Sequence, residues 1–496
     1  MNVESRFVNR YLLLAVVAAA FLFATSASAQ VALTQLSQDT FTDSASQHAT
    51  EVEPGAFTWG STIVTGFQVA RIFGGGGADI GFATSTNSGA TWTNGYLPGL
   101  TIYEDNGSSD AASDAAVAYD AMHGVWLIST LPIGATNTSV AVSRSTDGIN
   151  WDKPVAVTKL GSPDKNWIVC DNTATSKYYG HCYAEWDDTA NNDTIEMSTS
   201  TDGGLTWSKE AETAAKDQGV GGNPLVLRNG TVVVPINGFN GVIAFTSTNG
   251  GTSWNKAVTV STDISHTEAG SLRSAGLIAA AIDAGGKIYV AWPDCRYRVD
   301  CAENDIVYST STTGTKWSAV ERVPIDGVLS TVDHFIAGLG IAPGTKGASA
   351  HLALAYYYYP ASKCTEGTCE LYAGFIQSST GGRTWSAPIT LAGPMHMSEL
   401  PNTFSGYMVA DYVSVGFGGG KAFPIFASAN AKSGSLFNEA IYTTTDGQSA
   451  SIPEEEFLSS AGDQPLPNAH SDHGPREFLD QEDRIPVSGQ KPPERD

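Results

Sequence analysis

Acidic side chains stand where several short predicted strands begin, and they are the residues of this sequence best suited to chemistry. Asp114 and Asp164 begin two such strands, and Glu185 lies within another. Two carboxylates on one face can act as acid and as base or nucleophile in the cleavage of a glycosidic bond. The candidate catalytic residues are therefore Asp114, Asp164 and Glu185, and the polar residues expected to bind a substrate beside them are Lys165, His334 and Asp411.

The same polar groups also have a purely structural interpretation. If the strands surround one axis, their first residues meet at one face, where buried charges need partners of opposite sign. A ring of ion pairs that fills the axis would use the same side chains as a substrate site. The sequence leaves both interpretations open, because it does not give the separation of the carboxylates.

A short pattern, Ser/Thr-x-Asp-x-Gly-x-Thr-Trp, recurs along the chain and sets the positions of these strands. Its third positions lie at 87, 147, 202, 249, 313 and 380, with a reduced copy at 446, so successive copies stand 47 to 67 residues apart. Glycine permits positive φ in a tight turn, and the Asp or Asn side chain can accept backbone N–H groups there. The tryptophan can pack between neighbouring units. A repeat of this length corresponds to one four-stranded unit with its loops.

The strands predicted around each copy are typical of a β-propeller. Three short alternating strands precede each turn, and the tryptophan begins a fourth. The predicted fold class is all-β, a propeller of four-stranded antiparallel blades over residues 30–450. We expect seven blades, with six as the alternative because the first unit lacks a typical first strand. The last unit has no evident outer strand, and residues 31–41 are expected to supply it.

The two ends of the chain differ from the repeats. Arg6 and Arg10 precede an apolar run and the small residues Ala27-Ser28-Ala29, a pattern typical of a secretory signal, here over residues 1–29. We expect a secreted or periplasmic mature protein with no membrane span. Residues 451–496 are rich in Pro, Glu, Asp and Gln, which predicts a disordered acidic tail.

Cysteine spacing indicates the redox environment of the protein, and net charge limits the kinds of partner that it can bind. The six cysteines form three close pairs, and export to an oxidising compartment predicts a disulfide within each pair. These pairs are Cys170 with Cys182, Cys295 with Cys301, and Cys364 with Cys369. A net charge of −24 argues against nucleic acid as a partner. We expect no cofactor and no metal, and a monomer.

The recurring turns resemble the Asp-boxes, or bacterial neuraminidase repeats, of sialidase-like propellers of the secreted bacterial type. The resemblance covers roughly residues 48–450. Two other segments, Asp164-Lys165-Asn166-Trp167 and Ala291-Trp292-Pro293-Asp294-Cys295-Arg296, are also similar to such proteins. The box is specific for this fold and much less specific for an activity, because it lies at turns away from the site.

The resemblance also implies the parts of a site. Family sialidases hold the substrate carboxylate with three arginines, and they use a tyrosine activated by a glutamate as nucleophile beside an acid/base aspartate. In this chain it implies Arg71, Arg273 and Arg296 as the substrate-binding arginines and Tyr412 as a catalytic residue. The family's Arg-Ile-Pro motif is replaced here by Arg71-Ile72-Phe73.

Two functions of different classes are compatible with these features. The first is a secreted glycoside hydrolase of the exo-sialidase type that acts on extracellular glycans. It requires a cleft with at least two convergent arginines, a tyrosine and an acid. The alternative is a non-catalytic propeller that binds a glycan or a protein, in which the ring charges neutralise one another and no open pocket is expected.

Overall fold

A computed structural model describes residues 31–134, 138–274, 276–449, 458–460 and 462–466. All of the described residues belong to one compact unit. The predicted signal over residues 1–29 lies outside the described residues. Within the described ranges, no helix is long and apolar enough to cross a membrane.

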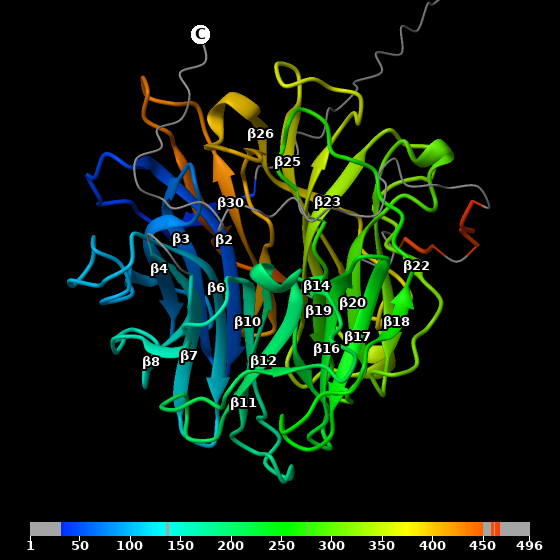
Figure 1. The fold of residues 1–496 in the computed structure, drawn as a ribbon. Helices are drawn as coiled ribbons and strands as arrows, with labels where there is room; N and C mark the ends of the chain where they lie inside the picture. Colours follow the sequence, from blue (N-terminus) through cyan, green and yellow to red (C-terminus); the bar gives the residue numbers. More distant parts are fainter. Residues whose placement is uncertain (1–30, 135–137, 275, 450–457, 461, 467–496) are drawn as a thin grey trace, which may run out of the picture. The chain divides into compact units, whose positions relative to one another are not determined.

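The described part of the chain is all-β, as predicted, and its short antiparallel strands follow one another in groups of four (Figure 1). The first group is β2 (Ser46–Trp59), β3 (Thr62–Ile72), β4 (Gly77–Ser85) and β5 (Thr93–Tyr96). The second is β6 (Ala111–Asp120), β7 (Val125–Ile133), β8 (Val140–Ser145) and β9 (Val155–Thr158). These two groups join into one sheet where Gly77 pairs with Ala112.

The middle groups repeat this order of strands. The third is β10 (Pro163–Cys170), β11 (Cys182–Asp188), β12 (Thr194–Ser200) and β13 (Ala211–Glu212). In the fourth, β14 (Gly219–Val220) and β15 (Leu225–Val226) both pair with β16 (Val232–Gly238), which is followed by β17 (Gly241–Ser247) and β18 (Val258–Ser261). The fifth is β19 (Ala279–Ile282), β20 (Ile288–Asp294), β21 (Asp305–Ser311) and β22 (Glu321–Arg322).

The last groups bring the two ends of the repeat region together. The sixth is β23 (Asp333–Ile341), β24 (Leu352–Tyr359), β25 (Glu370–Ser378) and β26 (Ile389–His396). The seventh is β29 (Ser414–Gly418), β30 (Lys421–Ala429), β31 (Glu439–Thr444) and the N-terminal strand β1 (Leu33–Gln35), with β32 (Gln448–Ser449) also on β30. Leu33 pairs with Thr444 and Gln35 with Tyr442. The expectation that residues 31–41 supply the missing outer strand is thus confirmed.

Short elements connect the groups. A hairpin of β27 (Asn402–Thr403) and β28 (Gly406–Tyr407) precedes the seventh group. Four 3-10 helices lie in loops: η1 (Thr189–Asn191), η2 (Val299–Cys301), η3 (Gly347–Ser349) and η4 (Met397–Glu399).

The first strands of the groups contact one another in sequence order. β2 contacts β6, β6 contacts β10, β10 contacts β15, β15 contacts β19, β19 contacts β23 and β23 contacts β29. The series closes because β29 contacts β2, and in Figure 1 the blue strand β2 lies beside the orange strand β30. Residues at the starts of these strands therefore meet although they are far apart in the sequence.

Four of the first strands carry the same irregularity. The register with the second strand shifts between Val52 and Gly55 in β2, between Ser113 and Ala116 in β6, between Asp164 and Trp167 in β10, and between Phe335 and Gly338 in β23. Each bulge holds one non-glycine residue at positive φ: Glu53 (57°), Asp114 (51°), Lys165 (45°) and Ile336 (49°). A bulge re-aims a side chain, and three of these four side chains are charged.

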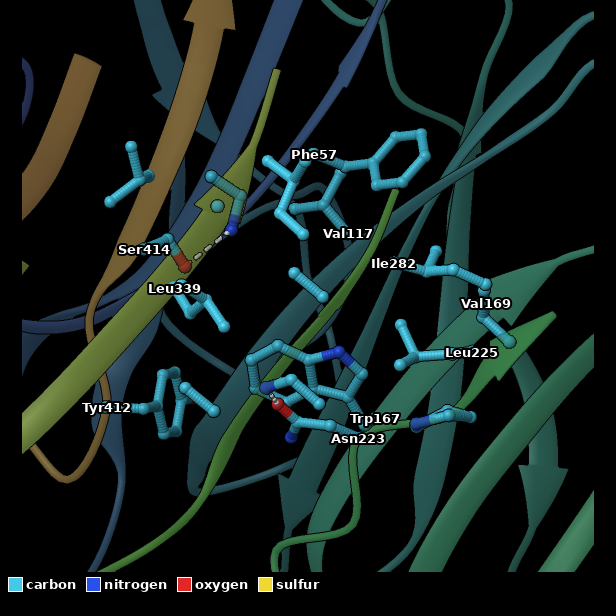
Figure 2. Close-up of a pocket in the computed structure, with 18 of the residues that line it drawn as sticks. Phe57, Val117, Trp167, Val169, Asn223, Leu225, Ile282, Leu339, Tyr412 and Ser414 are labelled. Carbon is cyan, nitrogen blue, oxygen red and sulfur yellow. Dashed lines mark hydrogen bonds between the residues drawn. The ribbon is translucent and has the colours of Figure 1, made fainter. Parts of the chain in front are cut away.

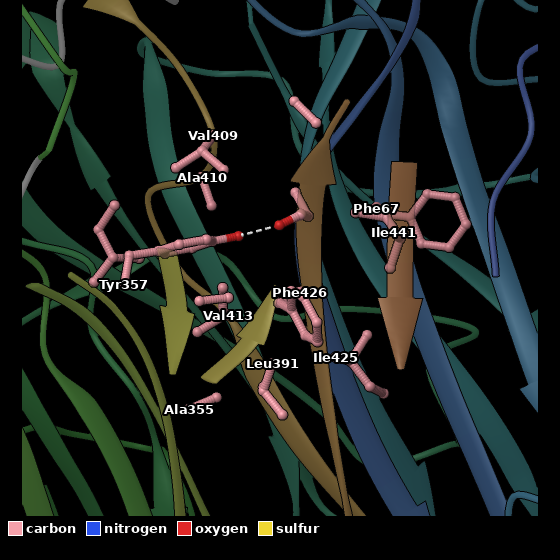
Figure 3. Packing of buried hydrophobic residues seen from close by; sticks show 14 of the residues in the cluster. Phe67, Ala355, Tyr357, Leu391, Val409, Ala410, Val413, Ile425, Phe426 and Ile441 are labelled. Atoms are coloured by element: carbon pink, nitrogen blue, oxygen red, sulfur yellow. Dashed lines mark hydrogen bonds between the residues drawn. The ribbon is translucent and has the colours of Figure 1, made fainter. Parts of the chain in front are cut away.

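Apolar side chains fill the space between neighbouring groups. Figure 3 shows Tyr357 of the sixth group with Val413, Ile425 and Phe426 of the seventh, all of them buried. The Tyr357 hydroxyl donates to the Ala427 carbonyl oxygen at 2.6 Å, so the polar end of this ring is also satisfied.

The recurring turns are closed by hydrogen bonds within the pattern. The Asp202 carboxylate accepts the backbone N–H groups of Leu205 (3.1 Å) and Thr206 (2.9 Å), and the hydroxyl of Ser200 accepts the N–H of Gly204 at 2.9 Å. Burial alone would raise the pKa of Asp202, but these accepted hydrogen bonds hold the pKa below its ordinary value. The turn is therefore a folding element.

The three predicted disulfides are confirmed. The bonds join Cys170 to Cys182, Cys295 to Cys301 and Cys364 to Cys369. Each closes a short loop, so its effect on chain entropy is modest.

Most of the predicted tail, residues 451–496, lies outside the described residues. Of its described parts, Leu458 exchanges two backbone hydrogen bonds with Trp385, of 2.7 and 2.9 Å. Asp463 lies 3.4 Å from the guanidinium of Arg322. These parts lie against the fifth and sixth groups.

We predict that Asp202→Ala lowers the free energy of unfolding by about 1 kcal/mol, because two backbone N–H groups lose their acceptor. Asp202→Asn should cost less, since Asn249 accepts the N–H of Ser253 in the same way at 3.0 Å. Urea unfolding of the three proteins measures both effects. Equal losses for the two variants would contradict this account of the turn.

Candidate functional site

The ammonium of Lys165 is the centre of a buried cluster of charges. Lys165 Nζ lies 2.7 Å from Asp411 Oδ2, 3.7 Å from Asp114 Oδ1 and 3.8 Å from Glu53 Oε1. Arg273 donates from Nε to Asp411 Oδ1 at 3.0 Å and also pairs through Nη2 with Oδ2. All five residues are buried, with exposed fractions of 7% or less. They come from the first strands of three groups and from the segments that precede two others.

The bulges of the first strands build this arrangement. Glu53, Asp114 and Lys165 are the positive-φ residues of the bulges that β2, β6 and β10 share, so each group contributes one charged side chain from the same structural position. Gln68 donates to Glu53 and, at 2.9 Å, to Ser113, whose hydroxyl donates to Asp114 at 3.1 Å. The carboxylates are thus connected to one another by neutral polar groups as well as by Lys165.

The pKa values of two carboxyl groups of the cluster are shifted in opposite directions. Burial raises the pKa of Glu53 well above its ordinary value, although Lys165 opposes the shift. Burial would also raise the pKa of Asp411, but Arg273 and Lys165 hold that pKa well below its ordinary value. The carboxyl groups of Glu53, Asp114 and Asp411 thus face the two cations Lys165 and Arg273. Groups of opposite charge type are therefore paired within the cluster.

Tyr412 lies beside the cluster with its hydroxyl buried. Its ring meets that of Trp167 edge to face, with centroids 5.3 Å apart. The hydroxyl has no hydrogen-bond partner among the described residues. Burial, together with Glu53 and Asp114, raises the pKa of Tyr412 well above its ordinary value. The tyrosinate that a nucleophilic role would use is therefore disfavoured.

The three arginines proposed as an anion clamp are each engaged by the protein itself. Arg273 belongs to the cluster. Arg71 is 1% exposed and donates to the sulfur of Met408 at 3.1 Å and to the carbonyl of Gly76. Arg296 donates to both carboxylate oxygens of Asp294, at 2.8 and 2.7 Å. Each guanidinium therefore has acceptors within the chain itself.

The other predicted site residues lie in different surroundings. Asp164 is buried and accepts the backbone N–H of Lys165 at 2.8 Å. Glu185 pairs across the sheet with Trp167, and burial raises its pKa well above the ordinary value against the opposing effect of the Gly222 backbone. A Cβ at Gly222 would lie 2.5 Å from Glu185 Cδ, so glycine is needed for this close approach.

His334 belongs to a second buried cluster of charges. Its Nε2 lies 4.0 Å from Asp326, and burial lowers the pKa of His334 to about 4. Asp305 and Asp326 are the remaining acids, and with His334 they form the one group of potential metal ligands found in the described part. Arg298 and Arg322 already pair with both carboxylates, so a cation would meet two positive charges. The expectation of no metal stays a prediction.

An elongated cavity of about 360 Å³ runs between the first strands. Figure 2 shows apolar side chains of different groups pointing into it, namely Phe57, Val117, Trp167, Leu225, Ile282 and Leu339. Lys165 and Tyr412 belong to its lining, and so do Asn223 and Ser414. Sequence patterns did not reveal this cavity, because its walls come from seven segments spread over the chain.

Residues 134–341 match the family described as BNR repeat-like domain. The matched range holds the turns at 147, 202, 249 and 313, so the resemblance predicted from these turns is confirmed. A comparison with curated proteins found no match.

Solved structures similar to this chain include two sialidases and a polysaccharide lyase. The structure titled Hadza microbial sialidase Hz136 has 13% identity, covers 75% of this chain and 74% of its own, and has a TM-score of 0.42. The NanB sialidase of Streptococcus pneumoniae has 14% identity, covers 83% and 70%, and has a TM-score of 0.40. A PL25 ulvan lyase has 10% identity, covers 82% and 96%, and has a TM-score of 0.47. These values say nothing about what this chain acts on.

We predict that Arg273→Met lowers the free energy of unfolding by about 3 kcal/mol, because it leaves the buried charge of Asp411 with one cation fewer. Arg383→Met is the matched control, since Arg383 is exposed and bonds to backbone carbonyl oxygens. The control should change stability by less than about 0.5 kcal/mol. Urea unfolding measures both variants, and equal effects would count against a structural role for Arg273.

Proposed function

We propose that this chain is an exported, seven-bladed BNR-repeat propeller that works by binding and does not cleave glycans. Each group of four strands is one blade, and β1 completes the seventh. The closed series of contacts between first strands supports this count. In the proposed organisation, residues 1–29 are a signal, residues 30–450 the propeller and residues 451–496 a tail. The three disulfides support an oxidising, extracellular destination.

The observation that carries the binding proposal is the buried cluster of paired side chains around Lys165. A hydrolase needs an acid and a base or nucleophile that reach the substrate. Here Asp411 is held by both Lys165 and Arg273, and Asp114 lies beside the same ammonium. All of these side chains are buried. They stabilise the packing of the first strands, as in the structural alternative left open by the sequence. The expectation of no open pocket in that alternative is wrong, because a cavity of about 360 Å³ lies between the first strands.

One observation favours the sialidase-type hydrolase as a second candidate. Tyr412 lines the cavity and lies beside carboxyl groups, which is the pairing of residue types that the resemblance implies for the nucleophile. A conformation in which the cluster is open to solvent would allow the Tyr412 hydroxyl to reach a substrate. We also propose a monomer for both candidates. The binding candidate takes a glycan or a protein as its partner, whereas the hydrolase candidate requires a glycan.

We predict that the purified protein does not hydrolyse a fluorogenic sialoside above the rate of the uncatalysed reaction. The liberated fluorophore is measured beside a known sialidase, and circular dichroism checks that the protein is folded. Turnover that Tyr412→Phe abolishes would contradict the binding proposal and establish the hydrolase. Leu329→Phe is a suitable control for the substitution, because Leu329 is 84% exposed.

A further inference from the structure

The cavity between the first strands has a closed end and a mouth. Lys165, the third residue of β10, and Tyr412, just before β29, form the closed end, where the buried cluster begins. The opposite end is lined by Trp59 and Ile282, the last residues of β2 and β19. Trp59 is 40% exposed, so this end meets solvent. The cavity therefore lies between the charged cluster and the ends of the first strands.

Several polar side chains of the cavity wall already bond to the protein itself. Ser414 accepts the backbone N–H of Ala56, and Asn223 accepts that of Ala280, each at 3.1 Å, as Figure 2 shows for Ser414. Thr58 likewise accepts the N–H of Phe417 at 3.1 Å. Each of these bonds joins the first strands of two different groups. A sugar in this cavity would lose water from its hydroxyl groups and find few partners, which is costly.

The remaining surface that a molecule in the cavity would meet is apolar and partly aromatic. Phe57, Trp167, Leu225 and Leu339 are all half-buried, so their exposed parts face a space that a ligand can enter. A volume of about 360 Å³ is at the lower end of the range of about 300–1,000 Å³ that is typical of small-molecule sites. It excludes a folded partner and fits a small molecule.

The charged groups at the closed end already have partners within the protein. Lys165 has Asp411, Asp114 and Glu53 as partners, and Asp411 has Arg273 as well. An anion would compete with these carboxylates for the ammonium, and a cation would meet the ammonium itself. The Tyr412 hydroxyl and the Asn166 amide oxygen have no hydrogen-bond partner among the described residues, which leaves two groups for polar substituents of a ligand.

We propose that this cavity is a binding site for a neutral small molecule with an aromatic body and at most two hydrogen-bonding groups. Trp167, Phe57 and Tyr412 supply aromatic contacts, and the aliphatic side chains of the other groups supply the remaining walls. Binding buries apolar surface without breaking the bonds between first strands. The inference does not rest on the proposed function, because it concerns the cavity and not the reactivity of the cluster.

The test uses N-phenyl-1-naphthylamine, a neutral aromatic probe whose fluorescence increases in apolar surroundings. Titration of the purified protein should give saturable binding of one probe per chain. The anionic relative 8-anilinonaphthalene-1-sulfonate has the same aromatic skeleton, and it should bind at least tenfold more weakly because its sulfonate must leave water. Equal binding of both probes would overturn the neutral-ligand inference.

Two variants locate the site. Leu225→Trp places a larger side chain in the cavity and should weaken binding of the neutral probe at least tenfold. Leu329→Trp makes the same change at a residue that is 84% exposed and should leave binding unchanged. If near-ultraviolet circular dichroism shows that Leu225→Trp does not fold, Ile282→Phe repeats the test at the mouth. Absence of saturable binding, or equal affinity in the cavity variant and the control, would overturn the proposal.

Discussion

Removing an ammonium group from water costs several kcal/mol unless carboxylates and hydrogen-bond acceptors replace the lost hydration. Lys165 meets this constraint with partners that no neighbouring stretch of sequence supplies. Asp411 follows it by 246 residues, and Glu53 and Asp114 belong to two other groups of strands. The ammonium can be buried only when these first strands have assembled. Their assembly and the pairing of the charges therefore depend on each other.

The backbone geometry of the first strands serves the same constraint. A non-glycine residue at positive φ costs about 1–3 kcal/mol, so it persists only where its surroundings compensate. Glu53, Asp114 and Lys165 all adopt this geometry within bulges, and all three reach the same cluster. The strain and the ion pairs occur together. Since bulges of this kind also occur beside active sites, their presence alone does not distinguish a binding site from a structural one, whereas the burial and pairing of the charges do.

The range of each interaction decides whether sequence patterns could predict it. The turns are closed by bonds between residues four or fewer apart, as from Asp202 to Thr206, so their pattern is visible in the sequence. The strands and the close cysteine pairs are similarly local. The cluster is long-range: Lys165, Arg273 and Asp411 were identified as polar residues near strand starts, but their mutual contacts were not. Glu53 was missed, because only the bulge in β2 aims it at Lys165. Arg296 and His334 lie outside this cluster, where Arg296 pairs with Asp294 and His334 lies near Asp326.

The central claim is that Lys165 and Asp411 are a structural pair that joins distant first strands. A double-mutant cycle with Lys165→Met and Asp411→Asn, followed by urea unfolding, measures their coupling directly. The account predicts a coupling free energy above about 1.5 kcal/mol, because each single variant leaves a buried charge that the double variant removes. Effects that add to within about 0.5 kcal/mol would contradict it and would make these two residues candidates for chemistry again.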